Sequence, residues 1–429
     1  MVDVRPFRAI RYTELAGDPR NLITQPYDKI DPEMQRAYYD RSAYNFCRIT
    51  LPMENDKYRI AQHRFQEWLR KGILAKDDQP AIFVCRQEFA LDGKCFTRTG
   101  IIAALQLYNY GEDMVFPHEI TYKEPKADRL NMMRNVQKDL EPVFLIYSDP
   151  ERATLCFFNE VAKTRPALMV EDSFGVKHTV WRVAEPTKIR LLQKAFETKK
   201  LVITDGHHRY ESAIAYRDER RQMEKKWSMD SAFNFHMSLL VPIQDDGLLA
   251  FPAHRLLKKH ALTDEAMDML EHFFTVTEID ATAKSLENFL ESHRNEHSFC
   301  IYSDAKAYGL ILRHDDRVYE FVSSKSSKET KLFDVVILRD VIFKEILRTG
   351  KLKLDQDILY ERWTSKAVER VDRGEAKLAF LMNPIDPKFI WQIAQQHERI
   401  PEKSTDFYPK PVSGLVMMDI SPGEKLKAK

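Results

Sequence analysis

The fold of this chain is decided by the stretch Leu201-Val202-Ile203-Thr204-Asp205-Gly206-His207-His208-Arg209-Tyr210-Glu211. Its apolar start predicts a buried strand, and Gly206 permits a backbone bend that a side chain would oppose. The run from Tyr210 to Lys225 contains no Gly or Pro, which predicts a helix. The polar turn therefore lies between the end of a strand and the N-terminus of a helix.

The residues of this turn are those that bind phosphate. Free backbone N–H groups and the helix dipole favour an anion at a helix N-terminus. Arg209 adds a planar guanidinium for phosphate oxygens, and Asp205 is the type of ligand that magnesium prefers. The alternative is that Asp205 only caps the helix and that His207 and His208 are ordinary histidines. Four such polar residues within five positions favour the phosphate site, because buried polar groups without partners cost about 1–3 kcal/mol each.

Composition indicates a folded protein of two or three domains. The chain has 429 residues, 44% of them hydrophobic, which is enough for a large core. Lys and Arg total 66 against 65 Asp and Glu, so the strongly basic balance of a general nucleic-acid binder is missing. A role on DNA would need a local basic patch.

The cysteines and the N-terminal sequence predict a cytoplasmic location. Five cysteines stand far apart, without a Cys-x-x-Cys pair or a zinc-type Cys/His array, which indicates reduced thiols. The N-terminus lacks the apolar core of a signal peptide. No stretch approaches the roughly 18 apolar residues that a membrane span needs. The sequence therefore predicts a protein that is neither exported nor inserted in a membrane.

Strand-like and helix-like patterns alternate along the chain and predict a mixed α/β (α+β) fold. Residues 81–85 and 101–107 have the pattern of strands, and 60–70 that of an amphipathic helix. A charged stretch gives way near Phe233 to a strand-like run, so we expect a domain boundary near residue 232. The second domain, residues 233–429, has its own patterns: strands at 298–302 and 308–312, and helices at 333–348 and 389–396.

A carboxylate stands ahead of a cluster of cations in the first domain. Pro117-His118-Glu119 is followed by Lys126, Arg129 and Arg134. With His118 beside it, Glu119 is a candidate general base for a hydroxyl group, and the three cations are candidate substrate contacts. The alternative is a solvated loop leading into a helix with surface ion pairs. The residues alone support both interpretations equally.

A second candidate binding loop lies near the C-terminus, between Pro401 and Lys410. Its prolines oppose a helix, and it combines lysines with hydroxyl residues. We expect Lys403 and Lys410 to reach phosphate groups of a substrate, with Ser404 and Thr405 as hydrogen-bond donors. An irregular surface loop would have a similar composition.

Together these motifs resemble domain-of-unknown-function family 1015, over essentially the whole chain. The Asp205-Gly206-His207-His208-Arg209 turn also resembles the phosphate motif of the ParB/sulfiredoxin superfamily. The resemblance implies a ParB/sulfiredoxin-like core in residues 1–232, with a large insertion at about residues 140–196. It also implies a C-terminal α/β domain that packs on this core and contributes the loop in which Lys403, Ser404 and Thr405 line the nucleotide or amino-acid pocket.

The motif order is similar to that of archaeal free L-serine kinases, which carry Pro-His-Glu ahead of Asp-Gly-His-x-Arg. The resemblance implies that Glu119 takes the proton of the serine hydroxyl, while Asp205, Gly206, His207, His208 and Arg209 hold phosphates and Mg²⁺. It implies ATP or ADP as cofactor, with pyrophosphate as a further donor, and free L-serine as the favoured metabolite among small hydroxyl-bearing acceptors. A homodimer is compatible with these expectations.

Two other function classes stay open at this point. A ParB-like nucleotide switch, possibly associated with DNA, would need a helix-turn-helix with a basic face, for which no convincing candidate follows residue 232. Phosphatase or sulfiredoxin-type chemistry is the other class, and no cysteine stands beside Asp205 to support a thiol mechanism.

Overall fold

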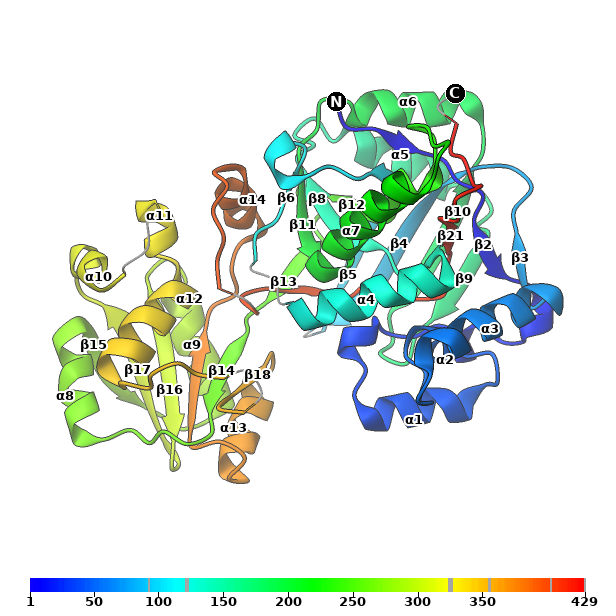
Figure 1. Cartoon of the computed structure of the whole chain (residues 1–429). Helices are drawn as coiled ribbons and strands as arrows, with labels where there is room; N and C mark the ends of the chain where they lie inside the picture. Colours follow the sequence, from blue (N-terminus) through cyan, green and yellow to red (C-terminus); the bar gives the residue numbers. More distant parts are fainter. Residues whose placement is uncertain (92, 120–122, 323–326, 354–355, 402, 428–429) are drawn as a thin grey trace. The chain divides into compact units, whose positions relative to one another are not determined.

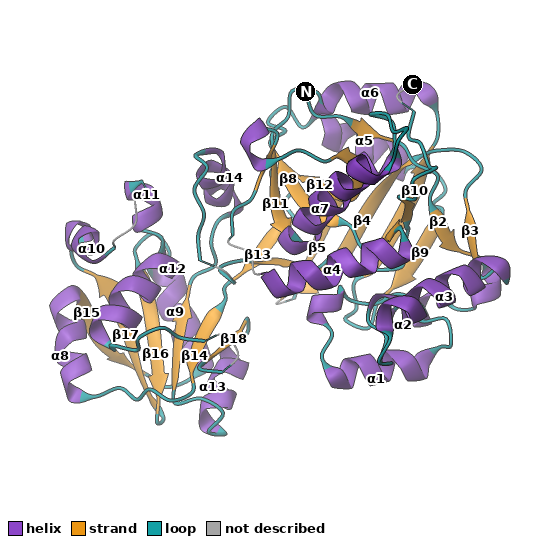
Figure 2. Ribbon diagram, in the orientation of Figure 1, coloured by secondary structure: helices purple, strands orange, loops and turns teal. Residues whose placement is uncertain are grey.

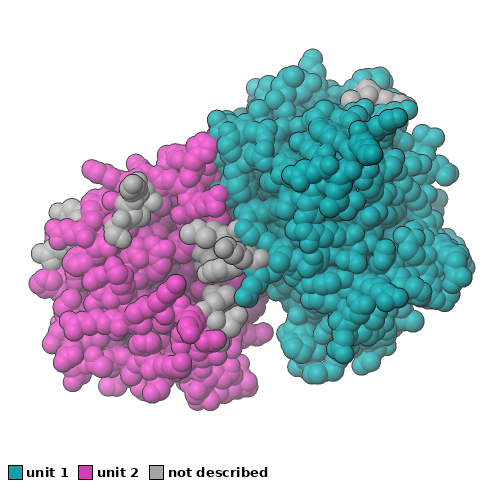
Figure 3. All heavy atoms as spheres, viewed as in Figure 1, with its two compact units in different colours: residues 1–117, 121–249, 409–429 teal, residues 118–120, 250–408 magenta. Residues whose placement is uncertain are grey.

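The computed structural model describes residues 1–91, 93–119, 123–322, 327–353, 356–401 and 403–427. Helices make up 37% of the chain and strands 27%, which confirms the mixed α/β class. The chain divides into two compact units, shown in teal and magenta in Figure 3. Unit 1 comprises residues 1–117, 121–249 and 409–429, and unit 2 comprises residues 118–120 and 250–408.

Unit 1 is built on a nine-stranded mixed sheet (Figures 1 and 2). Its order is β6 (Val115–Phe116), β11 (Leu201–Asp205), β8 (Val143–Tyr147), β12 (Phe235–Pro242), β5 (Lys94–Gln106), β4 (Ile82–Leu91), β10 (Lys177–Val183) and β9 (Leu168–Glu171), with β1 (Val4–Arg5) paired to β5. The pairs β11–β6 and β12–β8 are parallel and the others are antiparallel. Strands β8, β11 and β12 are buried at every position, as their apolar sequences require.

The helices of unit 1 cover this sheet. Helices α4 (Lys123–Val136) and α7 (His207–Met223) pack side by side across it, and α3 (Lys57–Arg70) packs on α4 (Figure 2). Elsewhere α5 (Ala153–Ala162) contacts the strands β4, β5 and β10, and α6 (Pro186–Phe196) contacts β1. The remaining elements of the unit are α1 (Pro32–Arg41), α2 (Cys47–Thr50) and the short strand pairs β2 (Ile10–Tyr12) with β3 (Leu74–Lys76) and β7 (Lys138–Asp139) with β21 (Met418–Asp419).

Unit 2 contains a six-stranded antiparallel sheet. Its order is β15 (Phe274–Ile279), β17 (Lys306–Leu312), β16 (Ser298–Ser303), β19 (Leu378–Met382), β14 (His254–Leu257) and β18 (Ile358–Glu361). The other elements that it contributes are α8 (Asp264–Phe273), α9 (Ala283–Ser292), α10 (Asp315–Phe321), α11 (Lys328–Lys331), α12 (Asp334–Ile337), α13 (Thr364–Asp372), α14 (Pro387–Gln395) and β20 (Asp406–Tyr408), which pairs with β13 (Leu249–Phe251). Leu286 and Leu290 of α9 belong to its core.

The observed division differs from the boundary expected near residue 232. Strand β12 follows that boundary, yet it lies inside the sheet of unit 1 because it pairs with both β5 and β8. Residues 409–429 also return to unit 1, where Met418 pairs with Asp139. The sequence pattern predicted β12 as a strand correctly but did not reveal its two partners, both of which lie more than 90 residues earlier in the chain.

Candidate functional site

The predicted strand, turn and helix are present around Asp205. Strand β11 ends at Asp205, and Gly206 adopts a left-handed conformation with φ of 88° before α7 begins at His207. A Cβ at Gly206 would lie 2.8 Å from Nε and 2.9 Å from Cζ of Arg209. Glycine is therefore required here for two reasons: the backbone conformation, and the guanidinium that lies against it.

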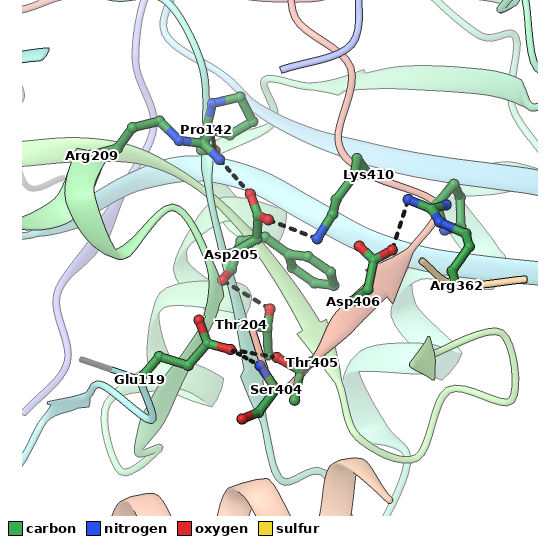
Figure 4. A network of polar contacts seen from close by, with 12 residues as sticks. Glu119, Pro142, Thr204, Asp205, Arg209, Arg362, Ser404, Thr405, Asp406 and Lys410 are labelled. Atoms are coloured by element: carbon green, nitrogen blue, oxygen red, sulfur yellow. Dashed lines mark hydrogen bonds and ion pairs between the residues drawn. The ribbon is translucent and has the colours of Figure 1, made fainter. Parts of the chain in front are cut away.

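Asp205 is the centre of a buried ion cluster in unit 1 (Figure 4). Its Oδ1 accepts a hydrogen bond from Lys410 Nζ at 2.8 Å, and its Oδ2 accepts one from Arg209 Nη2. Arg209 also donates to the carbonyl oxygen of Pro142. Burial alone would raise the pKa of Asp205, but the charges of Lys410 and Arg209 outweigh it and hold that pKa well below its usual range. Asp205 is therefore ionised at neutral pH.

The backbone around Lys410 is held by buried polar side chains of the sheet. Arg98, on β5, donates to the carbonyl oxygen of Pro409 and to Gln87 Oε1. Gln87, on β4, donates to the carbonyl oxygen of Lys410 at 3.1 Å. Arg98 is only 1% exposed. These contacts fix the chain segment that presents the Lys410 ammonium group to Asp205.

Magnesium does not fit Asp205 in this arrangement. Both carboxylate oxygens already accept hydrogen bonds from cationic groups, so a cation would have to displace Lys410 or Arg209. Among the described residues, no group of three or more His, Cys, Asp or Glu side chains is placed to hold a metal ion. Asp205 contacts two buried cations, and the assignment of this turn to phosphate stays a prediction.

The other cations expected near the first motif are paired on α4. Lys126 Nζ lies 2.7 Å from Glu211 Oε2, and the exposed Arg134 pairs with Glu219. Arg129 is buried and pairs with Asp128. Its Cζ atom lies 3.8 Å from the centre of the Tyr27 ring. Lys126 and Arg134 thus have the ion pairs of the solvated alternative, whereas Arg129 is part of the interior. Their assignment as substrate contacts stays a prediction.

The second cluster belongs to unit 2 and surrounds Glu119 (Figure 4). Glu119 Oε1 accepts hydrogen bonds from the backbone N–H of Ser404 at 3.2 Å and from Thr405 Oγ1 at 3.3 Å. Thr405 Oγ1 lies 2.9 Å from Nε2 of the buried His118, so the hydroxyl group accepts there while it donates to Glu119. The structure thus joins the Pro-His-Glu motif to the Lys403 loop.

Local backbone pairing holds Glu119 in place. Ile400 donates its backbone N–H to the carbonyl oxygen of His118 at 2.9 Å, and Glu119 forms a β-bridge with Ile400. Lys403 lies half-buried in the same loop, with a positive φ of 56°. Arg255, which the sequence reasoning did not assign to the site, is buried on β14, and its charge interacts favourably with Glu119.

Sequence reasoning missed three buried ionisable residues of unit 1: Glu141, Asp139 and His236. Glu141 accepts hydrogen bonds from Ser413 Oγ and from the backbone N–H of Tyr27. Burial raises the pKa of Asp139 to about 8 and lowers that of His236 to about 3, so both are uncharged at pH 7. The only signal in the sequence was an acidic pair, Asp139 and Glu141, directly before a fully apolar strand.

Asp139→Asn is expected to raise the free energy of unfolding at pH 8 and above by on the order of a few kcal/mol, and to change it little near pH 4. In the unfolded chain this carboxyl group loses its proton near pH 4, whereas the folded protein keeps it up to about pH 8. The stability contributed by the protonated group is therefore complete below pH 4 and is lost as the pH rises through 8. Urea unfolding at pH 4.5, 6 and 8.5 measures the difference.

Asparagine has the same shape and still accepts the hydrogen bond from the backbone N–H of Met237, so the fold should be kept. The ionisable side chains that line the same pocket as Asp139, besides His236, are Arg129, Arg209, Lys138 and Glu141. Asp245→Asn is the matched control. Asp245 is also buried, but its pKa is about 6, so its contribution is lost at a lower pH than that of Asp139. If the free energies of unfolding of Asp139→Asn and the unmodified chain differ by the same amount at all three pH values, Asp139 is not uncharged in the folded protein at neutral pH.

The sequence profile described as "Protein of unknown function (DUF1015)" matches residues 4–336. No curated protein matches the chain. Among solved structures, a free serine kinase in complex with AMP is similar at 14% identity and a TM-score of 0.39, covering 76% of this chain and 93% of that one. A conserved hypothetical protein from Pyrococcus furiosus is similar at 12% identity and a TM-score of 0.34, covering 71% and 90%. At these scores the likeness carries no argument, and the assignment of the site rests on the residues described above.

Among the described residues, no helix is long and apolar enough to cross a membrane.

Proposed function

Because this chain belongs to the DUF1015 family of proteins of unknown function, its activity has to be inferred from its site, and we propose that it is a phosphotransferase. It moves a phosphoryl group from a nucleotide, ATP or ADP, to a small hydroxyl-bearing acceptor. Pyrophosphate is a third candidate donor. The observation that carries the proposal is the Asp205 turn, where two buried cations contact one carboxylate at a helix N-terminus.

This turn is suited to the transferred phosphates. Helix α7 begins at His207, and the helix dipole is positive at this end. Arg209 offers further N–H donors, and Lys410 offers an ammonium group. An entering phosphate replaces part of the contact that these cations make with Asp205. Phosphoryl transfer relies on such positioning and charge neutralisation more than on covalent help.

We assign the role of general base to Glu119. The acceptor oxygen attacks the terminal phosphorus, the bond to the leaving phosphate oxygen breaks, and the hydroxyl proton passes to the Glu119 carboxylate. Ser404 and Thr405 keep that carboxylate in place through their hydrogen bonds to Oε1. The magnesium that accompanies a nucleotide in solution would enter the site together with the nucleotide.

Free L-serine is the acceptor that we propose first. The support is the order of the motifs, which resembles that of free serine kinases: Pro117-His118-Glu119, then the Asp205 turn, then the loop around Lys403. The product would be O-phospho-L-serine. The buried and paired state of Arg129 makes it a weaker candidate for a direct substrate contact than the sequence suggested.

Phosphorus NMR on the purified chain tests the proposal. ATP, ADP and pyrophosphate are supplied with magnesium in separate tubes, each with L-serine or with L-alanine, which lacks the hydroxyl group. A new phosphomonoester signal that requires L-serine is the expected result. Signal from another alcohol but not from L-serine would keep the phosphotransferase and replace the acceptor. Release of inorganic phosphate alone, or no turnover with any donor, would contradict the proposal.

A further inference from the structure

A pocket in unit 1 contains the uncharged pair formed by Asp139 and His236. The pocket is open to solvent and spans about 340 Å³, a volume that includes solvent outside its walls. Elements α4, β7, α7 and β12 contribute to it. Its walls are Arg129, Met132, Met133, Lys138, Asp139, Leu140, Glu141, Arg209 and His236. Within the part of the chain that the structure describes, neither the Glu119 cluster nor the Lys403 loop contributes a residue to this lining.

One buried oxygen atom in this pocket lacks a hydrogen-bond partner among the described residues. Asp139 is 2% exposed, and its Oδ2 accepts from the backbone N–H of Met237 at 2.8 Å. Its Oδ1 accepts and donates nothing, and the nearest ionisable atom, His236 Nε2, lies 3.6 Å away. That separation is too long for a direct hydrogen bond. A buried oxygen atom costs free energy unless a water molecule or a ligand supplies its hydrogen-bond partner.

The protons on the two side chains are set by their other contacts. His236 Nδ1 lies 2.7 Å from the carbonyl oxygen of Met237, which only accepts, so Nδ1 carries the hydrogen atom and Nε2 is a free acceptor in the neutral ring. Asp139 is protonated at neutral pH because burial raises its pKa to about 8. Since Oδ2 already accepts from Met237, the proton belongs on Oδ1. The pocket therefore offers one O–H donor beside one nitrogen acceptor.

The cationic side chains that line the pocket are already neutralised. Arg129 pairs with Asp128, Lys138 with Asp419 at 2.8 Å, and Arg209 with Asp205. The remaining walls, Met132, Met133 and Leu140, are apolar and suit a short carbon skeleton. An anionic ligand would have to compete with Asp128, Asp419 and Asp205 for these cations, whereas an uncharged ligand would not.

We propose that this pocket binds a small, uncharged, hydroxyl-bearing molecule whose hydroxyl group bridges Asp139 Oδ1 and His236 Nε2. An oxygen atom can lie roughly 2.8 Å from both atoms, accepting from the carboxyl group and donating to the imidazole. An ammonium ion cannot accept the first hydrogen bond, and an ether cannot donate the second. The site goes beyond the phosphotransferase proposal and does not depend on it.

Nitrogen NMR of the full chain labelled with ¹⁵N-histidine at pH 7 tests the site. Glycerol and 1,2-propanediol are the probes, and 1,2-dimethoxyethane is the control that lacks a hydroxyl donor. The expected result is a saturable change of the His236 Nε2 resonance with both alcohols and none with the ether. His254 is an internal control, because it is also buried and has a pKa near 3, but lies in unit 2. An equal response to the ether or an equal response of His254 would overturn the proposal. No saturable change with either alcohol would also overturn it and would indicate that a water molecule bridges the two side chains.

A pair of variants at Asp139 sharpens the test. Asp139→Asn keeps a donor in the form of its amide group, so the alcohol response should remain. Asp139→Leu is similar in size but removes the donor, and the apparent affinity for glycerol should fall at least tenfold. If circular dichroism shows that the leucine variant is unfolded, the unmodified chain is titrated at pH 9.5 instead. Ionised Asp139 has no O–H donor there, and undiminished glycerol binding at that pH would sink the bridging role.

Discussion

Asp205→Asn is expected to lower the free energy of unfolding by roughly 3–5 kcal/mol at pH 7, the usual cost of removing one partner from a buried ion pair. The substitution leaves the charges of Lys410 and Arg209 buried without the carboxylate that they share. Urea unfolding followed by circular dichroism measures the loss. Asp246→Asn is the matched control, since the Asp246 side chain is 93% exposed and its removal should change stability little.

The loss of unfolding free energy in Asp205→Asn should depend on pH in a defined direction. The pKa of Asp205 is depressed in the folded protein, so its contribution is present above the unfolded value near 4 and is lost as the pH falls through the folded value. The difference between variant and unmodified chain should therefore shrink below pH 4. A difference that persists unchanged at pH 2.5 would show that the carboxylate charge is not its source.

Inorganic phosphate should stabilise Asp205→Asn more than it stabilises the unmodified chain. Without the carboxylate, the anion is the natural partner of Arg209 and Lys410, and a ligand that binds only the folded state raises its stability. Thermal unfolding with 0 and 50 mM phosphate, at constant ionic strength, measures the effect. Equal stabilisation of both proteins would argue against an anion site at this turn.

Glu119→Gln is expected to reduce phosphoryl transfer by about 10²–10⁴-fold, the usual contribution of a general base, while nucleotide affinity changes less than twofold. Glutamine keeps an oxygen acceptor for the Ser404 N–H and the Thr405 hydroxyl, so the loop should stay in place. It cannot take a proton. Turnover by phosphorus NMR and nucleotide affinity by calorimetry separate the two effects.

Glu124→Gln is the control for this change, because Glu124 is an exposed glutamate five residues further along the chain. It should retain full turnover. Equal loss of transfer and of nucleotide binding in Glu119→Gln would assign that residue to binding and remove it from the role of base. Full activity in Glu119→Gln would leave the reaction without its proposed proton acceptor.

Local patterns in the sequence were enough to predict the polar turn. Residues 201–203 are apolar, Gly206 breaks the strand, and the following run has no helix breaker, so β11 and α7 follow from neighbouring residues alone. The helix predicted at 60–70 lies within α3, and the strands predicted at 81–85 and 101–107 overlap β4 and β5 except for residues 81 and 107. The helix predicted at 333–348 is present as α12 followed by a π-helix from Leu338 to Ile346.

What the sequence could not predict depends on contacts between distant residues. Lys410 was expected to bind substrate, and nothing in its own segment indicated that it pairs with Asp205, 205 positions earlier. The link from Glu119 to Ser404 and Thr405 spans an even longer separation. The protonation of Asp139 depends on burial by strands that periodicity identifies but does not arrange. Partner choice between strands was therefore the missing information.

The return of residues 409–429 to unit 1 has a consequence for synthesis of the protein. A ribosome completes Asp205 and Arg209 long before Lys410, and the whole of unit 2 except residues 118–120 is translated in between. A nascent chain shorter than 410 residues therefore lacks the hydrogen bond from Lys410 to the buried Asp205 carboxylate. The polar centre of the first unit is thus finished only after the second unit has been made, and release of the last segment is what gives Asp205 its second partner.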